Sequence, residues 1–297
     1  MIGGTGFVGR HVVTALENRE VPIVTISRHA ARRGGHRRAD IGDFEELSQA
    51  LEGVRRVVNL VAASPLLPRG VQARYVHTHV RGVRALLAAC RRRGIERLIH
   101  VGAMGVREDS TPGYARTKAW GERAVASSAV PSMVLSPSIL FGWGSELIGT
   151  LDLAARFPVV PLPVIPTVFS PIFVGDFATL IAEVAISSDA EFSARPSRLQ
   201  VAGPDDLSGT TFAGRFFAAR GCRTVPIPAR PVEVAIRVAE AAKLLGFPAD
   251  LRAMLSLENA PTGDAPLLRT PTSYLDWLGS VTRRWGLAPR EPRIVFL

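Results

Sequence analysis

The sequence contains few residues of several kinds, and each scarcity excludes a class of protein. It has two cysteines, Cys90 and Cys222, and no Cys-x-x-Cys pair, so neither a disulfide framework nor a cysteine-based zinc site is expected. No apolar stretch approaches the length of a membrane span, and no basic region followed by an apolar signal core opens the chain. We therefore expect a globular, cytoplasmic protein without a membrane span.

Lysine is nearly absent, and arginine carries the excess positive charge. The only lysines are Lys118 and Lys243, yet the formal net charge is +10. Such a charge is compatible with nucleic acid, an anionic membrane surface or a phosphate-bearing ligand. The basic residues form short clusters at 28–38, 91–93 and 283–284 with no interleaved aromatic platform. We expect no nucleic-acid partner.

The glycines at the start of the chain form a phosphate-binding pattern. Gly3, Gly6 and Gly9 are spaced G-x-x-G-x-x-G ahead of an apolar run typical of a helix face. In dinucleotide-binding folds this turn follows a strand and directs backbone N–H groups at a pyrophosphate. Only Met1 and Ile2 remain to form that strand. We expect a truncated first strand and interpret Met1 as an internal methionine of a longer reading frame, in which about five more apolar residues complete the strand.

Strand and helix patterns alternate along the first half of the chain. Strands are predicted at 21–28, 54–63, 95–105 and 131–142, and helices at 44–53 and 71–93, the latter containing Cys90. This alternation predicts βαβ units and a Rossmann-type, doubly wound parallel sheet of the α/β class.

The pattern changes after Trp143. Residues 153–177 are rich in proline and predict an irregular connection, followed by a helix at 177–186. Two strand patterns, a helix pattern at 210–220 and two or three further helices predict a smaller C-terminal α/β lobe. We expect a nucleotide-binding domain at 1–145 and about 171–186, and a lobe for substrate or partner at 146–170 and 187–297.

The end of the strand at 21–28 bears on cofactor choice. It carries Ser27 and Arg28, where an NAD-specific fold usually places an acidic residue that holds the ribose 2′-hydroxyl. Arginine suits a 2′-phosphate, which favours NADP(H) over NAD(H). The alternative is that Arg28, with Arg32 and Arg33, belongs to a solvated basic loop.

A second motif lies in the segment GYARTKAWGERAV. Helical spacing places Lys118 one turn beyond Tyr114 on the same face. Because the chain has only three tyrosines and two lysines, chance gives this spacing in roughly a few per cent of cases. An ammonium beneath a phenol lowers the pKa of the phenol and hydrogen-bonds a ribose, so we expect Tyr114 to act as general acid or base in hydride transfer. The alternative is that Tyr114 is an exposed helix residue that stacks on the smaller lobe.

The motifs together resemble a known family. GGTGFVGRHV, ADIGD, NLVAA, GYARTK, SPSILFG and SPIFVGDFA occur in the order found in extended or atypical short-chain dehydrogenases/reductases, often labelled NAD-dependent epimerase/dehydratase. The sequence is most similar to the NADPH-binding accessory subunit of respiratory complex I and its bacterial relatives, over about residues 1–186.

The resemblance implies a role for each motif residue. Tyr114 and Lys118 are implied as the catalytic pair and also as contacts of the nicotinamide ribose. The implied cofactor contacts are Gly3, Thr5, Gly6, Phe7, Val8 and Gly9 at the pyrophosphate, Ser27 and Arg28 at the adenosine phosphate, Asp40 and Ile41 at adenine, Ala62 and Ala63 in the cleft, and Pro137 and Ser138 beside the carboxamide.

Two departures leave the function open. Gly102 and Ala103 stand where active members carry a catalytic serine or threonine, unless Ser110 or Thr111 folds back, and Ser136 stands where relatives often carry arginine. One hypothesis is an NADP(H)-dependent oxidoreductase or epimerase acting on a carbonyl or hydroxyl substrate. The other is a redox-inactive, NADPH-bound structural or assembly protein that engages a protein partner. A third, a nucleic-acid or redox-sensing regulator, draws only on the charge.

The sequence also contains two neighbouring histidines, His77 and His79. We expect a helix to carry them on the flank of the nucleotide domain, and no third metal ligand accompanies them. No metal site is therefore expected.

Overall fold

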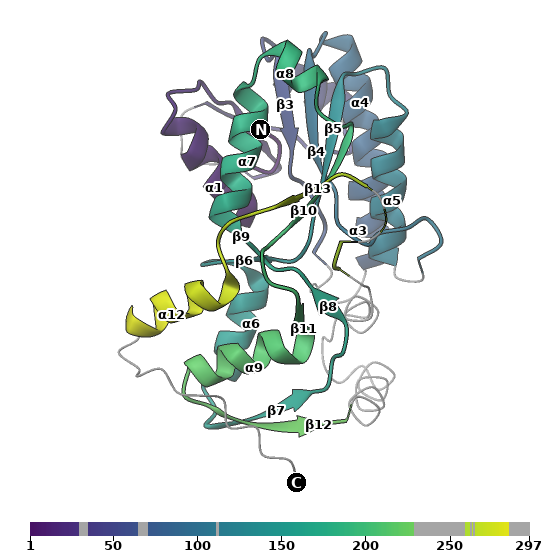
Figure 1. Cartoon of the computed structure of the whole chain (residues 1–297). Helices are drawn as coiled ribbons and strands as arrows, with labels where there is room; N and C mark the ends of the chain where they lie inside the picture. Colours follow the sequence, from purple (N-terminus) through teal and green to yellow (C-terminus); the bar gives the residue numbers. More distant parts are fainter. Residues whose placement is uncertain are drawn as a thin grey trace.

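The fold is built on a parallel β-sheet (Figure 1). The computed structural model describes residues 1–29, 35–64, 71–110, 113–228, 259–261, 263 and 265–284. Five strands pair in the order β13-β10-β5-β4-β3. These strands are β13 (Leu267–Arg269), β10 (Arg198–Ala202), β5 (Ser132–Pro137), β4 (Arg97–Val101) and β3 (Arg56–Asn59).

The start of the chain extends this sheet on the far side of β3. Ile2 forms parallel bridges to Asn59 in β3 and to Ile26 in β1 (Thr25–Ser27). Strand β1 in turn pairs in parallel with β2 (His36–Arg38). Ile2 thus holds the central position between β3 and β1. This arrangement confirms the predicted α/β Rossmann-type parallel sheet.

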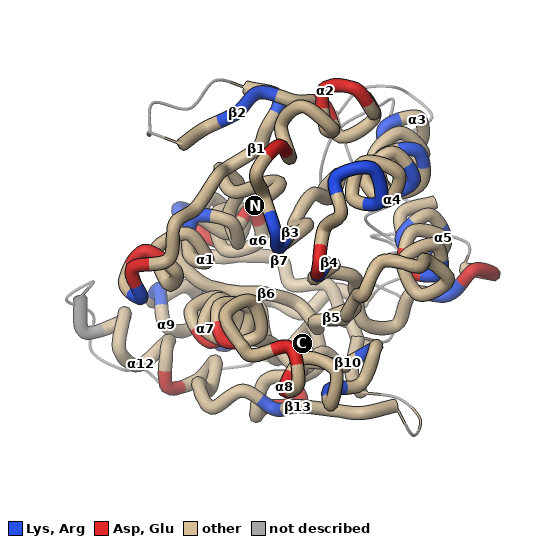
Figure 2. The backbone as a smooth tube through the Cα atoms, turned by 90° about the horizontal axis from the view of Figure 1, so that it is seen from above, with Lys and Arg blue, Asp and Glu red and all other residues tan. Residues whose placement is uncertain are grey.

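Helices cover both faces of the sheet, which explains why its strands are apolar along their length. On one face lie α1 (Phe7–Glu17) and α7 (Val174–Ile186), and on the other lie α2 (Phe44–Ala50), α4 (Gly82–Arg92) and α5 (Gly113–Ala126) (Figures 1 and 2). Every residue of β4 is buried. Free Cys90 lies inside α4, as predicted.

The helix predicted at 71–93 contains a change of helix type. It runs as α3 (Val71–Tyr75), a π-helical segment η1 (Val76–Arg81) and then α4. Such π-helical turns inside α-helices occur frequently at functional sites. Here the segment carries His79, which is buried.

Several elements after β5 form a second layer of structure beyond the sheet (Figure 1), whereas α7, α8 (Asp189–Ser193), β10 and β13 belong to the sheet or cover it. Helices α6 (Glu146–Ala154), α9 (Gly209–Ala219) and α12 (Tyr274–Arg284) pack with β7 (Val159–Pro163) and β12 (Arg223–Ile227) around a separate apolar cluster. The other short elements are β6 (Leu140–Phe141), β8 (Val168–Phe169), β9 (Ile172–Phe173) and β11 (Leu207–Ser208).

The expectation of an irregular connection over 153–177 is therefore wrong. Residues Val159–Pro163 form β7, which pairs in parallel with β12. Pro161 and Pro163 are tolerated because β7 lies in a two-stranded sheet, where one side of the strand needs no ladder donors. Among the described residues, no helix is long and apolar enough to cross a membrane.

Candidate functional site

The glycine turn lies at the carboxyl end of the central strand position. Gly3 has a φ of +80°, and a Cβ at Gly9 would overlap the Gly3 carbonyl oxygen and lie 2.7 Å from the Gly4 backbone. Helix α1 begins directly after Gly6 with no side-chain cap and no acidic residue in its first turn. Its first N–H groups and the positive end of its dipole are therefore available to an anion.

This turn opens where the chain changes direction across the sheet. A Cβ at Gly3 would lie 3.1 Å from Val61 Cγ2, so the turn borders the segment that follows β3. In open α/β sheets, ligands bind in the crevice at such a switch point, outside the carboxyl ends of the strands. Thr5 and Gly6 are exposed there, and Phe7 and Val8 are half-buried. The residues present fit a pyrophosphate.

The predicted adenosine contacts differ in their exposure. Ser27 ends β1, with its hydroxyl donating to the His29 carbonyl at 2.8 Å, and Arg28 is exposed. Asp40 accepts from His77 Nε2 at 2.8 Å and from the Gly42 N–H at 2.7 Å.

The neighbours of Asp40 and Ile41 determine which of their groups can contact an adenine. Burial alone raises the pKa of the Asp40 carboxyl, but the hydrogen bond from Gly42 and the His77 contact outweigh it, so the pKa lies below its usual value. Ile41 packs in the core and is 5% exposed. Only the backbone of Ile41 is thus available to border an adenine.

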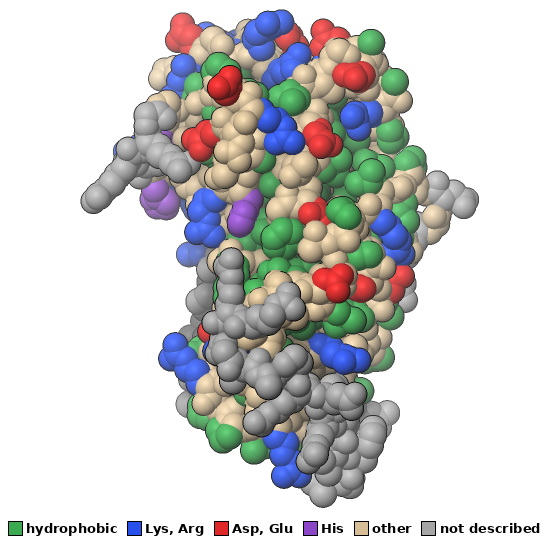
Figure 3. Space-filling model, turned by 60° about the vertical axis from the view of Figure 1, so that its left-hand side comes forward, with side chains coloured by type: hydrophobic (Ala, Val, Ile, Leu, Met, Phe, Trp, Pro, Cys, Tyr) green, Lys and Arg blue, Asp and Glu red, His purple; other side chains and the backbone are tan. Residues whose placement is uncertain are grey.

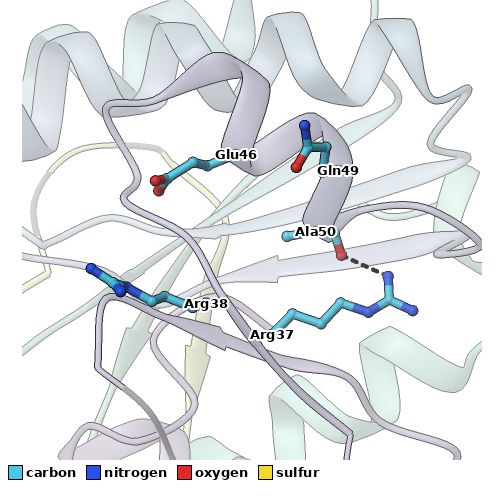
Figure 4. A pocket seen from close by; sticks show the side chains of 5 residues that line it. All are labelled: Arg37, Arg38, Glu46, Gln49 and Ala50. Atoms are coloured by element: carbon cyan, nitrogen blue, oxygen red, sulfur yellow. Dashed lines mark hydrogen bonds between the residues drawn. The ribbon is translucent and has the colours of Figure 1, made fainter.

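A shallow cavity of about 430 Å³ lies between β2 and α2 (Figure 4). It is lined by Arg37, Arg38, Glu46, Gln49 and Ala50. Arg37 and Arg38 extend in different directions from β2 (Figure 4). Arg37 donates to the Ala50 carbonyl at 2.8 Å, which ties β2 to the end of α2. Arg38 is exposed and pairs in register with Ser27.

Tyr114 and Ala63 lie close together, and Ala63 follows Val61 at the glycine turn by two residues. Tyr114 packs against a small cluster formed by Ala63 and Tyr75. The rings of Tyr75 and His79 also meet Tyr114 edge-on, with centroids 5.7 and 5.4 Å away. Ala62, the neighbour of Ala63, is exposed.

Burial controls the pKa values of the Tyr114 and Lys118 side chains. Desolvation, with a smaller contribution from Glu122, raises the pKa of Tyr114 to about 12. The expectation that Lys118 lowers this pKa is wrong, because burial of the phenol dominates. Desolvation also lowers the pKa of Lys118 to about 8, against the opposing charge of Glu122. The Lys118 ammonium donates to the Val101 carbonyl at 2.7 Å.

His79 connects three parts of the site. Its Nε2 accepts from the Ala63 N–H at 3.1 Å, and its Nδ1 lies 3.0 Å from Thr117 Oγ1. Because Thr117 donates to the Gly113 carbonyl, Nδ1 carries the proton in this network. Burial lowers the pKa of His79 to about 2, so the imidazole is neutral. Sequence reasoning placed His79 on a helix but missed this role.

The end of β5 is closed by hydrogen bonds. Pro137 is buried, and its carbonyl accepts from the Met104 N–H at 2.8 Å. Ser138 is 4% exposed and donates to the Asn259 carbonyl at 2.5 Å, while accepting from the Ser170 N–H. The Ser138 side chain therefore joins three segments and does not face open space.

The structure explains the missing hydroxyl at the end of β4. A side chain at Gly102 would overlap the buried carboxylate of Glu122, so no serine fits there without a shift of Glu122. Ser110 is 9% exposed, and its hydroxyl accepts from the Arg107 N–H at 3.2 Å within its own turn. Thr111 lies outside the described residues, as do Arg32 and Arg33.

Known proteins are similar to this chain over part of its length. A ceramide reductase of Caulobacter vibrioides is 32% identical over 54% of this chain and 52% of its own length. The mitochondrial NADH dehydrogenase [ubiquinone] 1 alpha subcomplex subunit 9 of Rattus norvegicus is 27% identical over 64% of this chain and 53% of its own length. The chain thus spans about half the length of the curated relatives it matches.

Solved structures share the fold. An NADPH-dependent quinone oxidoreductase of Escherichia coli, in complex with NADPH, superposes with a TM-score of 0.69 at 18% identity, over 94% of this chain and 98% of that one. Residues 1–142, which contain the glycine turn, Tyr114 and Lys118, match the family model named NAD dependent epimerase/dehydratase family. The match covers just under half of the chain.

Proposed function

We propose that the chain binds NADP(H) at the carboxyl edge of its sheet and acts as an oxidoreductase or epimerase on a carbonyl or hydroxyl substrate. The observation that carries the proposal is that the segment after β3 borders both groups: Val61 lies against the glycine turn before the uncapped α1, and Ala63 packs against Tyr114. The match of residues 1–142 to the epimerase/dehydratase family model supports it.

The bound nicotinamide would supply or accept a hydride, and the chain's own groups handle the proton. With a pKa of about 12, the Tyr114 phenol stays protonated at neutral pH, which suits a general acid that donates to a carbonyl oxygen. Lys118 lies one turn further along α5 with an ammonium anchored to the Val101 carbonyl. Its remaining N–H donors are the groups we assign to the ribose.

The preference for the phosphorylated cofactor rests on two arginines. Arg28 follows β1, and Arg38 ends β2 in register with Ser27, so both emerge at the carboxyl ends of adjacent strands. Ser27 and Arg28 occupy the position at which an acidic residue would bind a 2′-hydroxyl. We expect Arg28→Gln to weaken NADPH binding about tenfold or more while changing NADH binding little.

The second layer of elements supports the proposed division of the chain. Its apolar cluster, with Phe216, Tyr274 and Trp277 buried, is separate from the clusters on the two faces of the sheet. We assign 1–145, about 171–186 and the strands β10 and β13, which lie in the main sheet, to the dinucleotide-binding domain. We assign 146–170 with α9, β12 and α12 to a lobe that borders the substrate. The matched relatives are named for ceramide and quinone chemistry, so a test panel should contain long-chain keto lipids and quinones.

The test is a titration of the purified chain with NADPH and NADH, followed by cofactor fluorescence, and turnover on the carbonyl panel. We expect NADPH to bind and at least one carbonyl to be reduced. Tyr114→Phe should lose about 10²-fold or more of this turnover and keep its NADPH affinity, because only the proton donor is removed. No binding of either cofactor would overturn the proposal.

The second candidate is a redox-inactive NADPH-binding protein that serves assembly. Two observations favour it: the Glu122 carboxylate occupies the space of a side chain at Gly102, and one matched relative is a subunit of NADH dehydrogenase. Loss of an oxyanion donor typically costs about 10² to 10³ in rate. NADPH binding without turnover on the whole panel would favour this candidate.

A further inference from the structure

Helix α5 carries a third ionisable residue in line with Tyr114 and Lys118. Glu122 follows Lys118 by four residues, so the three side chains form one stripe along the helix. Glu122 is 4% exposed. A carboxylate at this depth costs free energy unless it is paired and hydrogen-bonded, so its partners indicate what it does.

The first partner is the end of β4. Oε1 of Glu122 accepts from the Ala103 N–H at 2.9 Å, while Lys118 donates to the Val101 carbonyl at 2.7 Å. The two side chains therefore hold the peptide groups on either side of Gly102. Gly102 itself leaves room for the carboxylate because it has no Cβ. An acid and a base from consecutive turns of α5 thus clamp the same three residues.

The second partner is Arg198 at the start of β10. Its Nη2 donates to Oε2 of Glu122 at 2.6 Å, and its side chain is half exposed, at 51%. Both residues line a cavity of about 440 Å³ behind α5. One oxygen of Glu122 therefore faces the site, and the other faces an arginine that reaches solvent.

The charged and titratable groups around Lys118 come from three elements. Helix α5 contributes Tyr114 and Glu122, η1 contributes the neutral His79, and β4 contributes the neutral His100. Arg198 on β10 acts on Glu122. Burial raises the pKa of Glu122, and Arg198, Ala103 and Lys118 oppose that rise. Glu122 is the group that favours the charged form of Lys118.

We propose that Glu122 is a positioning residue of the Tyr114–Lys118 pair, fixing the end of β4 against α5 and serving as the counter-ion that keeps Lys118 an ammonium. The link to catalysis rests on the proposed function, because it assigns Tyr114 and Lys118 to proton donation and ribose binding. The electrostatic link between Glu122 and Lys118 is a property of the chain alone.

The scarcity of lysine makes a direct test practical. In protein labelled with ¹³C-lysine, the variant Lys243→Arg leaves Lys118 as the only labelled side chain. We expect its NMR titration midpoint near pH 8. Adding Glu122→Gln keeps the shape and the acceptor oxygen but removes the charge, so the midpoint should fall by about 1 pH unit or more. A folded Glu122→Gln protein with an unchanged midpoint would overturn the proposal.

The matched control is Glu108→Gln in the same Lys243→Arg background. Glu108 lines the same cavity, but it is paired with Arg123 at 2.9 Å and lies on the solvent side. We expect this variant to leave the Lys118 midpoint unchanged. An equal fall in both variants would mean that Lys118 responds to the general charge of the cavity, and would also overturn the specific role of Glu122.

A reciprocal measurement covers the case in which Glu122→Gln does not fold. The chemical shift of the Ala103 amide reports the ionisation of Glu122, because this amide donates to Oε1. Coupling between two sites is reciprocal, so Lys118→Met should raise the midpoint seen at Ala103, and an unchanged midpoint contradicts the proposal. Neither titration uses cofactor or substrate, so failure of NADPH binding would overturn the proposed function without changing these results.

Discussion

Gly9 illustrates how a single residue limits the cofactor site. A Cβ at this position would overlap the Gly3 carbonyl oxygen and lie 2.7 Å from the Gly4 backbone, neither of which is a flexible side-chain end. We expect Gly9→Ala to displace the turn and weaken NADPH binding about tenfold or more, with a loss of roughly 1–3 kcal/mol in the free energy of unfolding. Fluorescence titration and urea unfolding measure the two effects.

The matched control for Gly9→Ala is Gly149→Ala. Gly149 is exposed within α6, and nothing lies within 4 Å of its added Cβ. Because alanine has the higher helix propensity, this variant should be neutral or more stable by up to about 1 kcal/mol, with unchanged NADPH affinity. Equal binding losses in both variants would contradict the steric argument.

The two buried histidines predict sensitivity to acid. Burial lowers the pKa of His79 to about 2 and that of His100 to about 3, each from an ordinary 6.5. Below about pH 6.5 the unfolded chain therefore binds protons that the folded chain does not, so the free energy of unfolding falls as the pH falls towards 3. Each histidine contributes a slope of up to about 1.4 kcal/mol per pH unit.

His100→Gln isolates one of these contributions. His100 Nδ1 accepts from Asn59 at 3.0 Å, and the glutamine carbonyl offers a similar acceptor without a titrating proton. Urea unfolding at about pH 6 and pH 5 should show a smaller loss of stability in the variant, by roughly 1 kcal/mol. The same loss in both proteins would mean that His100 is not the source of the slope.

At the scale of the element, α1 is built to receive an anion rather than to be stable by itself. Its N-cap is Gly6, with extended backbone angles and no capping side chain. Gly6→Asn and Gly6→Asp each supply a cap for the N–H groups of the first turn, worth only a few tenths of a kcal/mol relative to glycine. A Cβ at Gly6 would lie 3.3 Å from the Gly3 oxygen, a contact that needs only a small shift.

The two Gly6 variants should separate capping from charge. Both are expected to raise the free energy of unfolding and weaken NADPH binding, because the new side chain takes the N–H groups that the pyrophosphate requires. Gly6→Asp should weaken binding further than Gly6→Asn, since its carboxylate repels the phosphates. Thermal unfolding and fluorescence titration check the opposite signs; tighter NADPH binding in either variant would refute the assignment of this helix end.

The elements that sequence patterns predicted are those with uniform apolar faces. Strands β3, β4 and β5 were predictable because both faces of the sheet are covered. Strand β2 was missed because its residues, His36, Arg37 and Arg38, are polar, and pairing with β1 rather than burial holds it in place. Strand β7 was missed because its prolines, Pro161 and Pro163, resemble a loop until β12 is seen beside it.

The candidate site likewise contains residues that a local pattern reveals and residues whose role depends on distant parts of the chain. Tyr114 and Lys118 were found because an i, i+4 spacing is local and visible in the sequence. Glu122 continues that spacing, but its role depends on the end of β4 and on Arg198, which lie 19 and 76 residues away in the chain. His79 likewise depends on contacts with Ala63 and Thr117. The signal that the sequence offered for Glu122 was the stripe of ionisable residues that it forms with Tyr114 and Lys118 on one helix face.

At the scale of the whole molecule, the charge of +10 is distributed rather than gathered. Lys and Arg occur on several elements (Figure 2), and on one face the basic, acidic and apolar side chains are interspersed (Figure 3). Many of the arginines are paired with acids, as Arg55 is with Glu96 and Arg107 with Asp109. Among the described residues on that face, the basic side chains form no continuous stripe of the kind that nucleic-acid binding uses.

We expect the net positive charge to make the affinity for the cofactor depend on the salt concentration. NADPH carries a phosphate that NADH lacks, and both cofactors approach the same positive molecule, so the attraction for NADPH is the more strongly screened. Between about 0.05 M and 0.5 M salt, the Kd for NADPH should rise more steeply than the Kd for NADH. Arg28→Gln should bring the two slopes together, because it removes the cation assigned to the 2′-phosphate. Equal slopes in the unmodified chain would place the extra phosphate away from Arg28 and remove the physical basis for the NADP(H) preference.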